Sequence, residues 1–331
     1  MASLIEKGWN QPGLINFLLL PLSYLYGIAM KLRFCLYRWN VKSSHELGVP
    51  VIVVGNLTAG GTGKTPLVIA LVQELKAKGY SPGVISRGYR ANPPFTPFEV
   101  DGHSEVDQVG DEPLLIYKRC CVPVVIGADR ILSGRTLIDK YNCDVIVSDD
   151  GFQHLRLQRD LDIVVVDGQR GLGNGWCLPA GPLREFKSAL HRADIVVING
   201  ESQGYPPELP ENGYRNYPMQ VEPATVEKAE AHPAETYAVA GLGNPERFFA
   251  MLDAHGIAFS KKAFPDHHHY REEDFAFANE TSVIYMTEKD AVKCENFSIV
   301  GRVIVVAISA YLPESFFSFI FDRLDAANKS D

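Results

Sequence analysis

The stretch from Ala59 to Pro66, AGGTGKTP, has the residue types and spacing of a phosphate-binding loop. It follows an apolar run that predicts a strand and precedes a periodic run that predicts a helix. Its backbone N–H groups can therefore converge on phosphate oxygens at the helix N-terminus. The strict pattern has a glycine where this chain has Thr58. The residues expected to bind the nucleotide are Gly60, Gly61, Thr62, Gly63, Lys64 and Thr65.

Within this loop, Lys64 is expected to reach the β- and γ-phosphates, and the Thr65 hydroxyl is expected to bind Mg²⁺. Two further metal ligands are expected at Asp149 and Asp150, which end an apolar run, because phosphoryl-transfer enzymes often hold Mg²⁺ with an acid at the end of a neighbouring strand. Asp167 ends another such run and is a weaker rival. No guanine-specific NKxD motif follows, so ATP is the predicted nucleotide.

Apolar, β-branched runs alternate with stretches of helical periodicity along most of the chain, which predicts an α/β fold with a parallel sheet. The composition changes after Gly200 to a stretch rich in Pro, Glu and Asn, with a short strand expected near 217–221, and a strand–turn–helix pattern then restarts. The sequence therefore predicts four parts. They are an N-terminal apolar segment at 1–45, a P-loop domain at 46–204, a linker at 205–232 and a smaller α/β domain at 233–331.

The apolar segment contains LINFLLLPLSYLYGIAM at 14–30, which carries no charge and is followed by basic residues. Pro21 interrupts it, and it is shorter than the roughly 20 apolar residues that a spanning helix needs. Two interpretations stay open: a buried helix that caps the domain, or a segment that lies in the membrane interface with its basic residues near anionic headgroups. Tyr24, Tyr26 and Trp39 are residue types that favour the interface.

The net charge of −8 argues against a broad nucleic-acid-binding surface, and no obligate protein partner is indicated. The six cysteines include no CxxC pair, which is typical of reduced thiols rather than of a disulfide framework or a zinc site. Three consecutive histidines at 267–269 cannot easily converge on one ion, so a metal site is not expected there.

Seven short motifs occur in a fixed order and resemble those of the tetraacyldisaccharide 4'-kinase family of the lipid A pathway. They are GGTGKTP (60–66), SRGY (86–89), VGDEP (109–113), SDDGFQH (148–154), LPAGPLRE (178–185), FPDHHHY (264–270) and TEKDAVK (287–293). The resemblance extends from about residue 10 to about residue 310. It implies transfer of the γ-phosphate of Mg-ATP to the 4'-hydroxyl of an acylated glucosamine disaccharide 1-phosphate, at the cytoplasmic face of the inner membrane. Such a protein would be peripheral or monotopic.

The same resemblance implies roles for individual residues. Asp111 would accept the proton of the sugar hydroxyl, and His267 would pair with Asp111 across a closing domain boundary. Arg184 would stabilise charge on the transferring phosphoryl group or bind the substrate phosphate. The remaining candidates for substrate contact are Arg87, Tyr89 and His154.

Two rival functions use the same loop. A soluble small-molecule kinase would not need the apolar segment for membrane binding. A membrane-associated regulatory ATPase would hydrolyse ATP without a phosphorylated lipid product. The loop does resemble that of partitioning ATPases, but their signature lysine is replaced here by Ala59.

Overall fold

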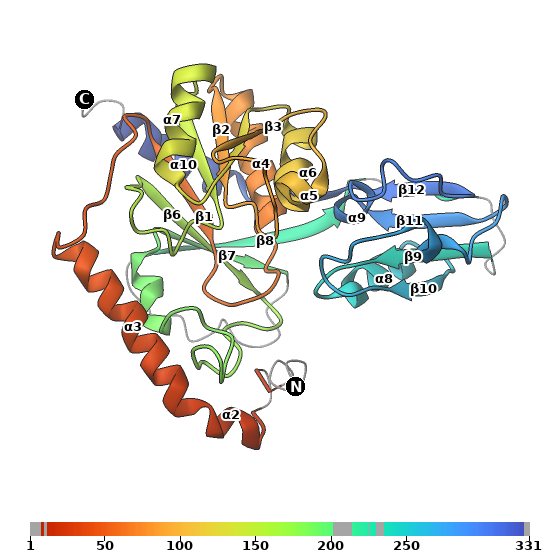
Figure 1. Cartoon of the computed structure of the whole chain (residues 1–331), viewed down its shortest axis with the longest axis horizontal. Helices are drawn as coiled ribbons and strands as arrows, with labels where there is room; N and C mark the ends of the chain where they lie inside the picture. The colour runs from red at the N-terminus through yellow and green to blue at the C-terminus, as the bar shows by residue number, and fades with distance from the viewer. Residues whose placement is uncertain (1–7, 10–11, 201–213, 225, 230–234, 328–331) are drawn as a thin grey trace.

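The computed structural model describes residues 8–9, 12–200, 214–224, 226–229 and 235–327. Within these ranges the chain forms a large α/β domain and a small α/β domain that lie side by side (Figure 1). The α/β architecture expected from the alternating strand and helix patterns is confirmed.

The large domain is built on a sheet whose central strands carry the buried apolar runs of the sequence. Its strands are β1 (Val51–Gly55), β2 (Pro82–Ser86), β3 (Phe98–Val100), β4 (Val124–Ile126), β5 (Val145–Asp149), β6 (Leu161–Asp167), β7 (Ile195–Asn199), β8 (Arg215–Pro223) and β13 (Ile308–Tyr311). Their order across the sheet is β13-β8-β7-β6-β1-β5-β2-β4-β3. Neighbouring strands are parallel except at the two edges, where β13 and β3 run antiparallel to their partners. The carboxyl ends of the parallel strands therefore meet at one edge of the sheet, where ligands of such folds bind.

Helices cover both faces of the large sheet. They are α4 (Lys64–Ala77), α5 (Val106–Val109), α6 (Asp111–Cys120), α7 (Arg130–Tyr141) and α10 (Glu314–Ala327), with a 3₁₀ turn at Lys187–Arg192. Successive side chains of β1 point to opposite faces of the sheet. Ile52 and Val54 pack with residues of α4, α6 and α10, whereas Val51 and Val53 pack with residues of α7. A strand buried on both faces is typical of a parallel sheet enclosed by helices.

Helix α4 is the element that carries the phosphate-binding loop onto the sheet. Its Leu67, Leu71 and Leu75 recur every four residues and are fully buried, so one face of the helix is fixed against the core. Burial of each such leucine stabilises this packing by about 1.5–3 kcal/mol. Pro66 lies in the first turn, where its missing N–H costs no helical hydrogen bond. The helix ends before Gly79, which has a φ of 92°.

The small domain contains a second, all-parallel sheet. Its strands are β9 (Thr236–Ala240), β10 (Ser260–Ala263), β11 (Val283–Thr287) and β12 (Arg302–Val306), in the order β10-β9-β11-β12. Its helices are α8 (Pro245–Ala254) and the short α9 (Glu288–Ala291), with a 3₁₀ turn at Glu272–Phe275. Helix α9 packs against α6 of the large domain, so the two domains meet along these helices (Figure 1).

The domain limits in the structure differ from the expected 46–204, 205–232 and 233–331. Strand β8 lies in the segment expected to be a linker, yet it pairs with β7 in the large sheet. The chain returns from the small domain through β13, which pairs with β8, and α10 then packs Phe316 and Ile320 into the large core. The pairing of β13 with β8 joins residues far apart in the sequence, and local periodicity carries no information about such partners.

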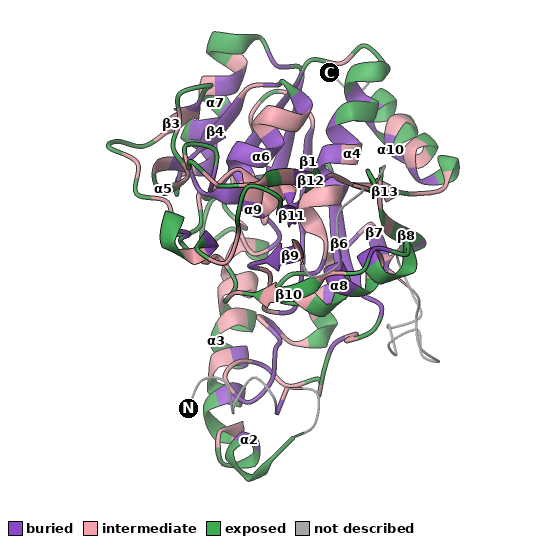
Figure 2. Ribbon diagram, turned by 90° about the vertical axis from the view of Figure 1, so that its right-hand side faces the viewer, coloured by how far each residue is buried: buried purple, intermediate pink, exposed green. Residues whose placement is uncertain are grey.

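The N-terminal apolar segment forms α2 (Leu14–Leu18) and α3 (Leu20–Arg38), which lie along one side of the large domain. One side of α3 contacts that domain: the Ser23 hydroxyl accepts a hydrogen bond from the Ala180 N–H at 2.8 Å, and Gly27 lies against the Phe186 ring. The opposite side of both helices is exposed (Figure 2). Among the helices that the structure describes, none has the length and apolar character needed to cross a membrane.

Candidate active site

The phosphate-binding loop connects the carboxyl end of β1 to the first residue of α4. Gly60 and Gly63 adopt φ values of 94° and 93°, a region that glycine enters without steric cost. The Asn56 amide donates to the carbonyl oxygens of Thr58 at 2.8 Å and Gly60 at 3.2 Å, which holds the loop in its curve. The loop therefore presents backbone N–H groups at the N-terminus of a fourteen-residue helix, as a phosphate site requires.

Side chains from other elements hold the loop on its far side. The Asn199 amide, at the end of β7, donates to the Thr62 carbonyl at 2.9 Å. Arg247 of α8 in turn donates to the side-chain oxygen Oδ1 of Asn199 at 3.1 Å, which ties the small domain to this side of the loop. Arg170 donates to the Gly61 carbonyl. Asn199, Arg170 and Arg247 were not predicted as site residues, although Asn199 ends a buried strand at the same edge of the sheet.

Asp149 is the last residue of β5, and Asp150 follows it. Both lie beside this loop because β5 pairs directly with β1. The Lys64 ammonium is 3.5 Å from an Asp150 oxygen, and the Arg184 guanidinium is 3.0 Å from both Asp150 oxygens. Burial alone would raise the pKa of Asp150, but the charges of Lys64 and Arg184 outweigh it and lower the pKa. Asp150 is therefore an ionised carboxylate held by two cations.

Asp149 has different surroundings from its neighbour. It is 1% exposed, and one of its oxygens accepts a 3.4 Å hydrogen bond from the Ser86 hydroxyl. The other oxygen is buried and has no hydrogen-bond partner among the described residues. Burial, together with the negative charge of Glu112, raises the pKa of Asp149. A buried carboxylate oxygen without a partner is suited to a cation, and the cation would favour the ionised form.

Arg184 reaches Asp150 because the segment 178–185 runs alongside the phosphate-binding loop. The backbone N–H of Arg184 donates to the Leu57 carbonyl at 2.8 Å, and Ala59 donates to the Pro182 carbonyl at 2.8 Å. These contacts fix the direction in which the guanidinium leaves the backbone. The structure therefore joins Lys64, Asp150 and Arg184 in one cluster.

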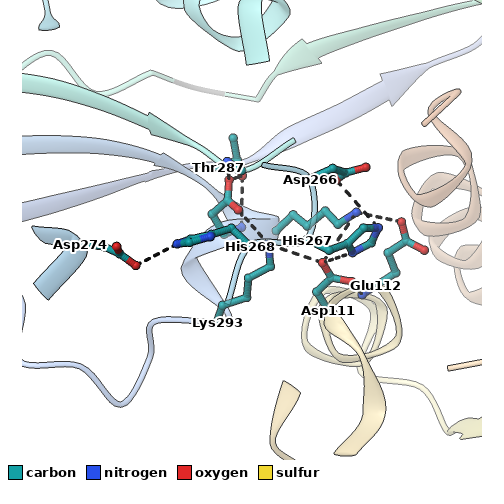
Figure 3. Close-up of polar contacts among 11 residues, drawn as sticks. Asp111, Glu112, Asp266, His267, His268, Asp274, Thr287 and Lys293 are labelled. Carbon is teal, nitrogen blue, oxygen red and sulfur yellow. Dashed lines mark hydrogen bonds and ion pairs between the residues drawn. The ribbon is translucent and has the colours of Figure 1, made fainter. Parts of the chain in front are cut away.

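The second predicted pair, Asp111 and His267, meets across the domain boundary (Figure 3). Asp111 is the first residue of α6 and is 5% exposed, and His267 Nδ1 lies 2.9 Å from its Oδ2. Burial alone would raise the pKa of Asp111. The His267 hydrogen bond and the charges of Lys289 and Lys293 outweigh burial and hold the pKa well below its usual range. Asp111 is therefore ionised at neutral pH, and His267 Nδ1 is the donor.

The space in front of Asp111 is a cavity of about 530 Å³ between the two domains. Tyr89, which is 58% exposed, lies on its wall, and its ring centroid is 5.6 Å from that of His267. The charge of Glu112, adjacent to Asp111, acts on Asp149 as described above. Helix α6 leads into β4, which is parallel to β2, so the N-terminal end of α6 lies toward the carboxyl ends of the parallel strands, as the acids beside the phosphate-binding loop do.

Arg87 and His154 are not brought into either cluster. Within the described chain neither side chain makes an ion pair or hydrogen bond with Lys64, Asp111 or the two acids after β5. Arg87 is exposed after β2. Burial lowers the pKa of His154 to about 4, and the positive charge of Arg130 adds to this effect, so its imidazole is neutral at physiological pH.

The three consecutive histidines contact three different carboxylates. His267 pairs with Asp111, and His268 lies 2.9 Å from Asp274 (Figure 3). His269 lies 3.3 Å from Asp107. Their side chains therefore diverge: His267 reaches α6 and His269 reaches α5 of the large domain, whereas His268 contacts a carboxylate of the small domain.

Comparison with known proteins gives one consistent result. The family model described as tetraacyldisaccharide-1-P 4'-kinase matches residues 15–325. A tetraacyldisaccharide 4'-kinase of Hahella chejuensis is 42% identical over 339 residues, which cover 98% of this chain and 97% of that protein. One of Actinobacillus succinogenes is 46% identical over 298 residues, covering 88% and 89%.

A solved structure is similar over almost the whole chain. It is the crystal structure of an "apo" form of LpxK from Aquifex aeolicus in complex with ATP, which is 29% identical to this chain with a TM-score of 0.78. The match covers 94% of this chain and all of that one. The large and small sheets described above therefore belong to a fold that is already known.

Proposed function

Because this chain belongs to the tetraacyldisaccharide-1-P 4'-kinase family, we propose that it transfers the γ-phosphate of ATP to the 4'-hydroxyl of a tetraacylated glucosamine disaccharide 1-phosphate. The observation that carries this proposal is that two clusters both lie toward the carboxyl ends of the parallel strands of the large sheet. The phosphate-binding loop with Lys64 and Asp150 lies on one side, and the ionised Asp111 with His267 lies on the other. A donor site and an acceptor base are thus both present.

ATP is the phosphoryl donor, and the loop at 60–65 is its binding site. The N–H groups at the start of α4 bind phosphate oxygens, and Lys64 reaches the β- and γ-phosphates. Lys64 is presently 3.5 Å from Asp150, so the carboxylate holds the ammonium in the loop before the phosphates arrive. The relative from Aquifex aeolicus was solved with ATP, which supports this assignment.

Mg²⁺ is the proposed metal, and the residues present fit it. Carboxylate and hydroxyl oxygens are the ligands it prefers, and Asp149 offers a buried oxygen without a partner. Thr65 in the first turn of α4 would supply the hydroxyl, whereas Asp150 is engaged by Lys64 and Arg184 and would act through water. When bound, the ion would neutralise charge on the β- and γ-phosphates.

Asp111 is the proposed acceptor of the hydroxyl proton. Its low pKa makes it a weak base but a permanently ionised hydrogen-bond acceptor, which orients the 4'-hydroxyl for attack on phosphorus. A strong base is not needed, since the transition state of phosphoryl transfer is loose and positioning supplies most of the catalysis. The transfer is direct and in line. Lys64 and Arg184 supply positive charge to the transferring group.

The substrate's sugar is proposed to lie in the cavity in front of Asp111. Tyr89 lies on the cavity wall beside His267 and is a proposed contact with the disaccharide. Arg87 directly follows β2 and is exposed, so its guanidinium is available to a phosphate or hydroxyl group of the substrate. His154 remains a weaker proposal, because a neutral imidazole would offer a hydrogen bond but no charge.

The exposed apolar side of α2 and α3 is proposed to bind the cytoplasmic face of the inner membrane, from which the acylated substrate is taken. Its residues include Leu14, Leu18, Leu22, Leu25, Ile28 and Leu32, each 55–77% exposed. An amphipathic helix of this kind lies in the interface with its apolar side down and does not span the bilayer. Lys31 and Arg38 supply the positive charge that anionic headgroups attract.

A transfer assay tests the proposal. The wild-type protein is given γ-labelled ATP, Mg²⁺ and the tetraacyldisaccharide 1-phosphate in mixed micelles, and the product is mapped by phosphorus NMR. Label at the 4' position is expected, and Lys64→Met should lower its rate of formation by about 10²-fold or more. Release of free phosphate without labelled lipid would contradict the proposed function.

A further inference from the structure

Two buried lysines of the small domain face the carboxylate of Asp111, and the proposed mechanism above assigns them no role. The Lys293 ammonium is 3.6 Å from Asp111 Oδ2, and the Lys289 ammonium is 3.7 Å from the same oxygen. Their side chains are 6% and 17% exposed. Within the described residues, every side chain within 4 Å of Asp111 Oδ2 in an ion pair or hydrogen bond therefore comes from the small domain, since His267 does as well.

Lys293 is held in place by a buried carboxylate behind it. Its ammonium is 3.0 Å from Asp290, which is fully buried. Asp290 in turn accepts hydrogen bonds from the Gly241 N–H at 2.9 Å and from the Thr287 hydroxyl at 2.7 Å (Figure 3). The contacts that link Thr287, Asp290 and Lys293 therefore fix the Lys293 ammonium independently of Asp111. A pre-fixed donor loses little side-chain entropy when it binds its partner.

Lys289 is held by a different partner. It is 3.0 Å from Glu112, the residue after Asp111 on α6, and the negative charges of Glu112 and Asp111 raise its pKa despite its burial. Lys289 therefore contacts the first turn of α6 at two adjacent acids. The pair of lysines spans that turn from the side of the small domain.

These contacts belong to a longer line of ion pairs between α6 and the segment 288–295. At the other end of α6, Arg119 pairs with Glu288 and Lys118 pairs with Glu295. Acids at the start of α6 thus face bases of the small domain, and bases at its end face acids. If the small domain docked in reverse or shifted along α6, like charges would face each other. The pattern therefore fixes the register in which the small domain meets α6.

We infer that Lys289 and Lys293 are positioning residues of the transfer reaction, which orient the Asp111 carboxylate toward the acceptor hydroxyl and make its orientation depend on docking of the small domain. This inference rests on the proposed function, because it requires Asp111 to receive the hydroxyl. A carboxylate has two oxygens. The Glu112 N–H occupies Oδ1 at 3.0 Å, while His267 and both lysines gather around Oδ2.

The electrostatic consequence has a definite sign. The titratable groups that face Asp111 are His267 and the cations Lys289 and Lys293, with the anions Glu112, Asp266 and Asp290 behind them. Loss of a lysine leaves a buried carboxylate with less positive charge, so the pKa of Asp111 rises toward its ordinary value. The acidic limb of kcat/KM then moves to higher pH.

The first test measures kcat, KM for ATP and the pH profile for Lys289→Met and Lys293→Met. We expect kcat to fall roughly 10- to 100-fold, as for other losses of orientation, with KM for ATP within about twofold because neither lysine contacts the phosphate-binding loop. We also expect the acidic limb to move up by about 1 to 3 pH units, the effect of losing one close opposite charge. Lys118→Met is the matched control. It removes an ion pair of the same interface and should leave the acidic limb in place.

Two further variants separate positioning from folding. Lys293→Met leaves Asp290 buried without a partner, so the double variant Lys293→Met with Asp290→Asn removes that uncompensated charge and keeps the oxygen that accepts from Gly241. It should melt near the wild-type temperature and still show the displaced acidic limb. Lys293→Arg keeps the charge and should recover at least half of the lost activity.

An unmoved acidic limb in both methionine variants, with Asp111→Asn inactive, would overturn the inference and leave the proposed function intact. Full activity of Asp111→Asn would overturn the proposed role of Asp111 itself, and the inference with it. A fall in kcat that is the same at every pH and equal in Lys118→Met would mean that the lysines only dock the domains.

Discussion

The exposed side of α2 and α3 allows a quantitative prediction about membrane binding. We consider replacement of Leu18 and Leu25 together by glutamine, which keeps helix propensity and removes two of the most exposed apolar side chains. They are 72% and 65% exposed, and the contacts of α3 with the large domain are made instead through Ser23 and Gly27. The fold should therefore be unaffected by the change.

The magnitude follows from the exposed fractions. Full burial of a leucine side chain is worth about 1.5–3 kcal/mol, and roughly two-thirds of that, about 1–2 kcal/mol, is available to each of these residues. The pair then contributes about 2–4 kcal/mol, and since 1.4 kcal/mol is a factor of ten, partitioning should weaken roughly 30- to 1,000-fold. Glutamine also adds a polar group at the interface, so the loss of partitioning should be at least this large.

The assay is sedimentation with sucrose-loaded vesicles that contain anionic lipid. The matched control is a variant with Val300 and Val305 replaced by glutamine. These side chains are 50% and 48% exposed in the small domain, away from α2 and α3. The control should bind vesicles as the wild-type protein does. Unchanged binding of the Leu18/Leu25 variant, or an equal loss in the control, would refute the assignment of this side to the membrane.

Three predictions concern the phosphate-binding loop. Lys64→Met should lower kcat/KM by about 10²-fold or more, because one charged contact to the transferring phosphoryl group is lost; a loss below tenfold in the coupled assay would contradict this. Gly63→Ala should abolish ATP binding in calorimetry. Its φ is 93°, and an added Cβ would overlap the Asn199 amide, so binding with wild-type affinity would show that the loop adopts another conformation. Asn199→Ala should weaken ATP binding about fivefold, the value of one hydrogen bond of roughly 1 kcal/mol to the Thr62 carbonyl; an unaltered dissociation constant would exclude that support.

The elements that local patterns specify could be predicted from the sequence. The buried runs that end at Asn56, Asp149 and Asn199 are strands of the large sheet, and the glycine loop begins the helix at Lys64. The pairing of Asp111 with His267 followed from family resemblance and not from spacing, because 156 residues separate the two positions. The structure places them 2.9 Å apart.

Other features depend on contacts between distant segments and were missed for that reason. Lys289 and Lys293 lie in a motif that resembles one of the kinase family but predicts no role for them. Their effect on Asp111 requires the docking of α9 on α6. The return of α10 to the large core likewise depends on β13 pairing with β8. Arg184 was predicted as a site residue, but its contact with both Asp150 oxygens depends on the segment 178–185 lying beside the loop, which local patterns do not specify.

The central claim is that the acceptor base is assembled from two domains and that Asp111 and His267 act as one unit. A double-mutant cycle on kcat with Asp111→Asn, His267→Gln and the combined variant tests it most directly. Each single change should lower kcat by about 10²–10⁴-fold, and the combined variant should be no slower than the worse single variant within roughly threefold. A combined loss equal to the product of the two single losses would contradict the claim, because the two side chains would then act independently.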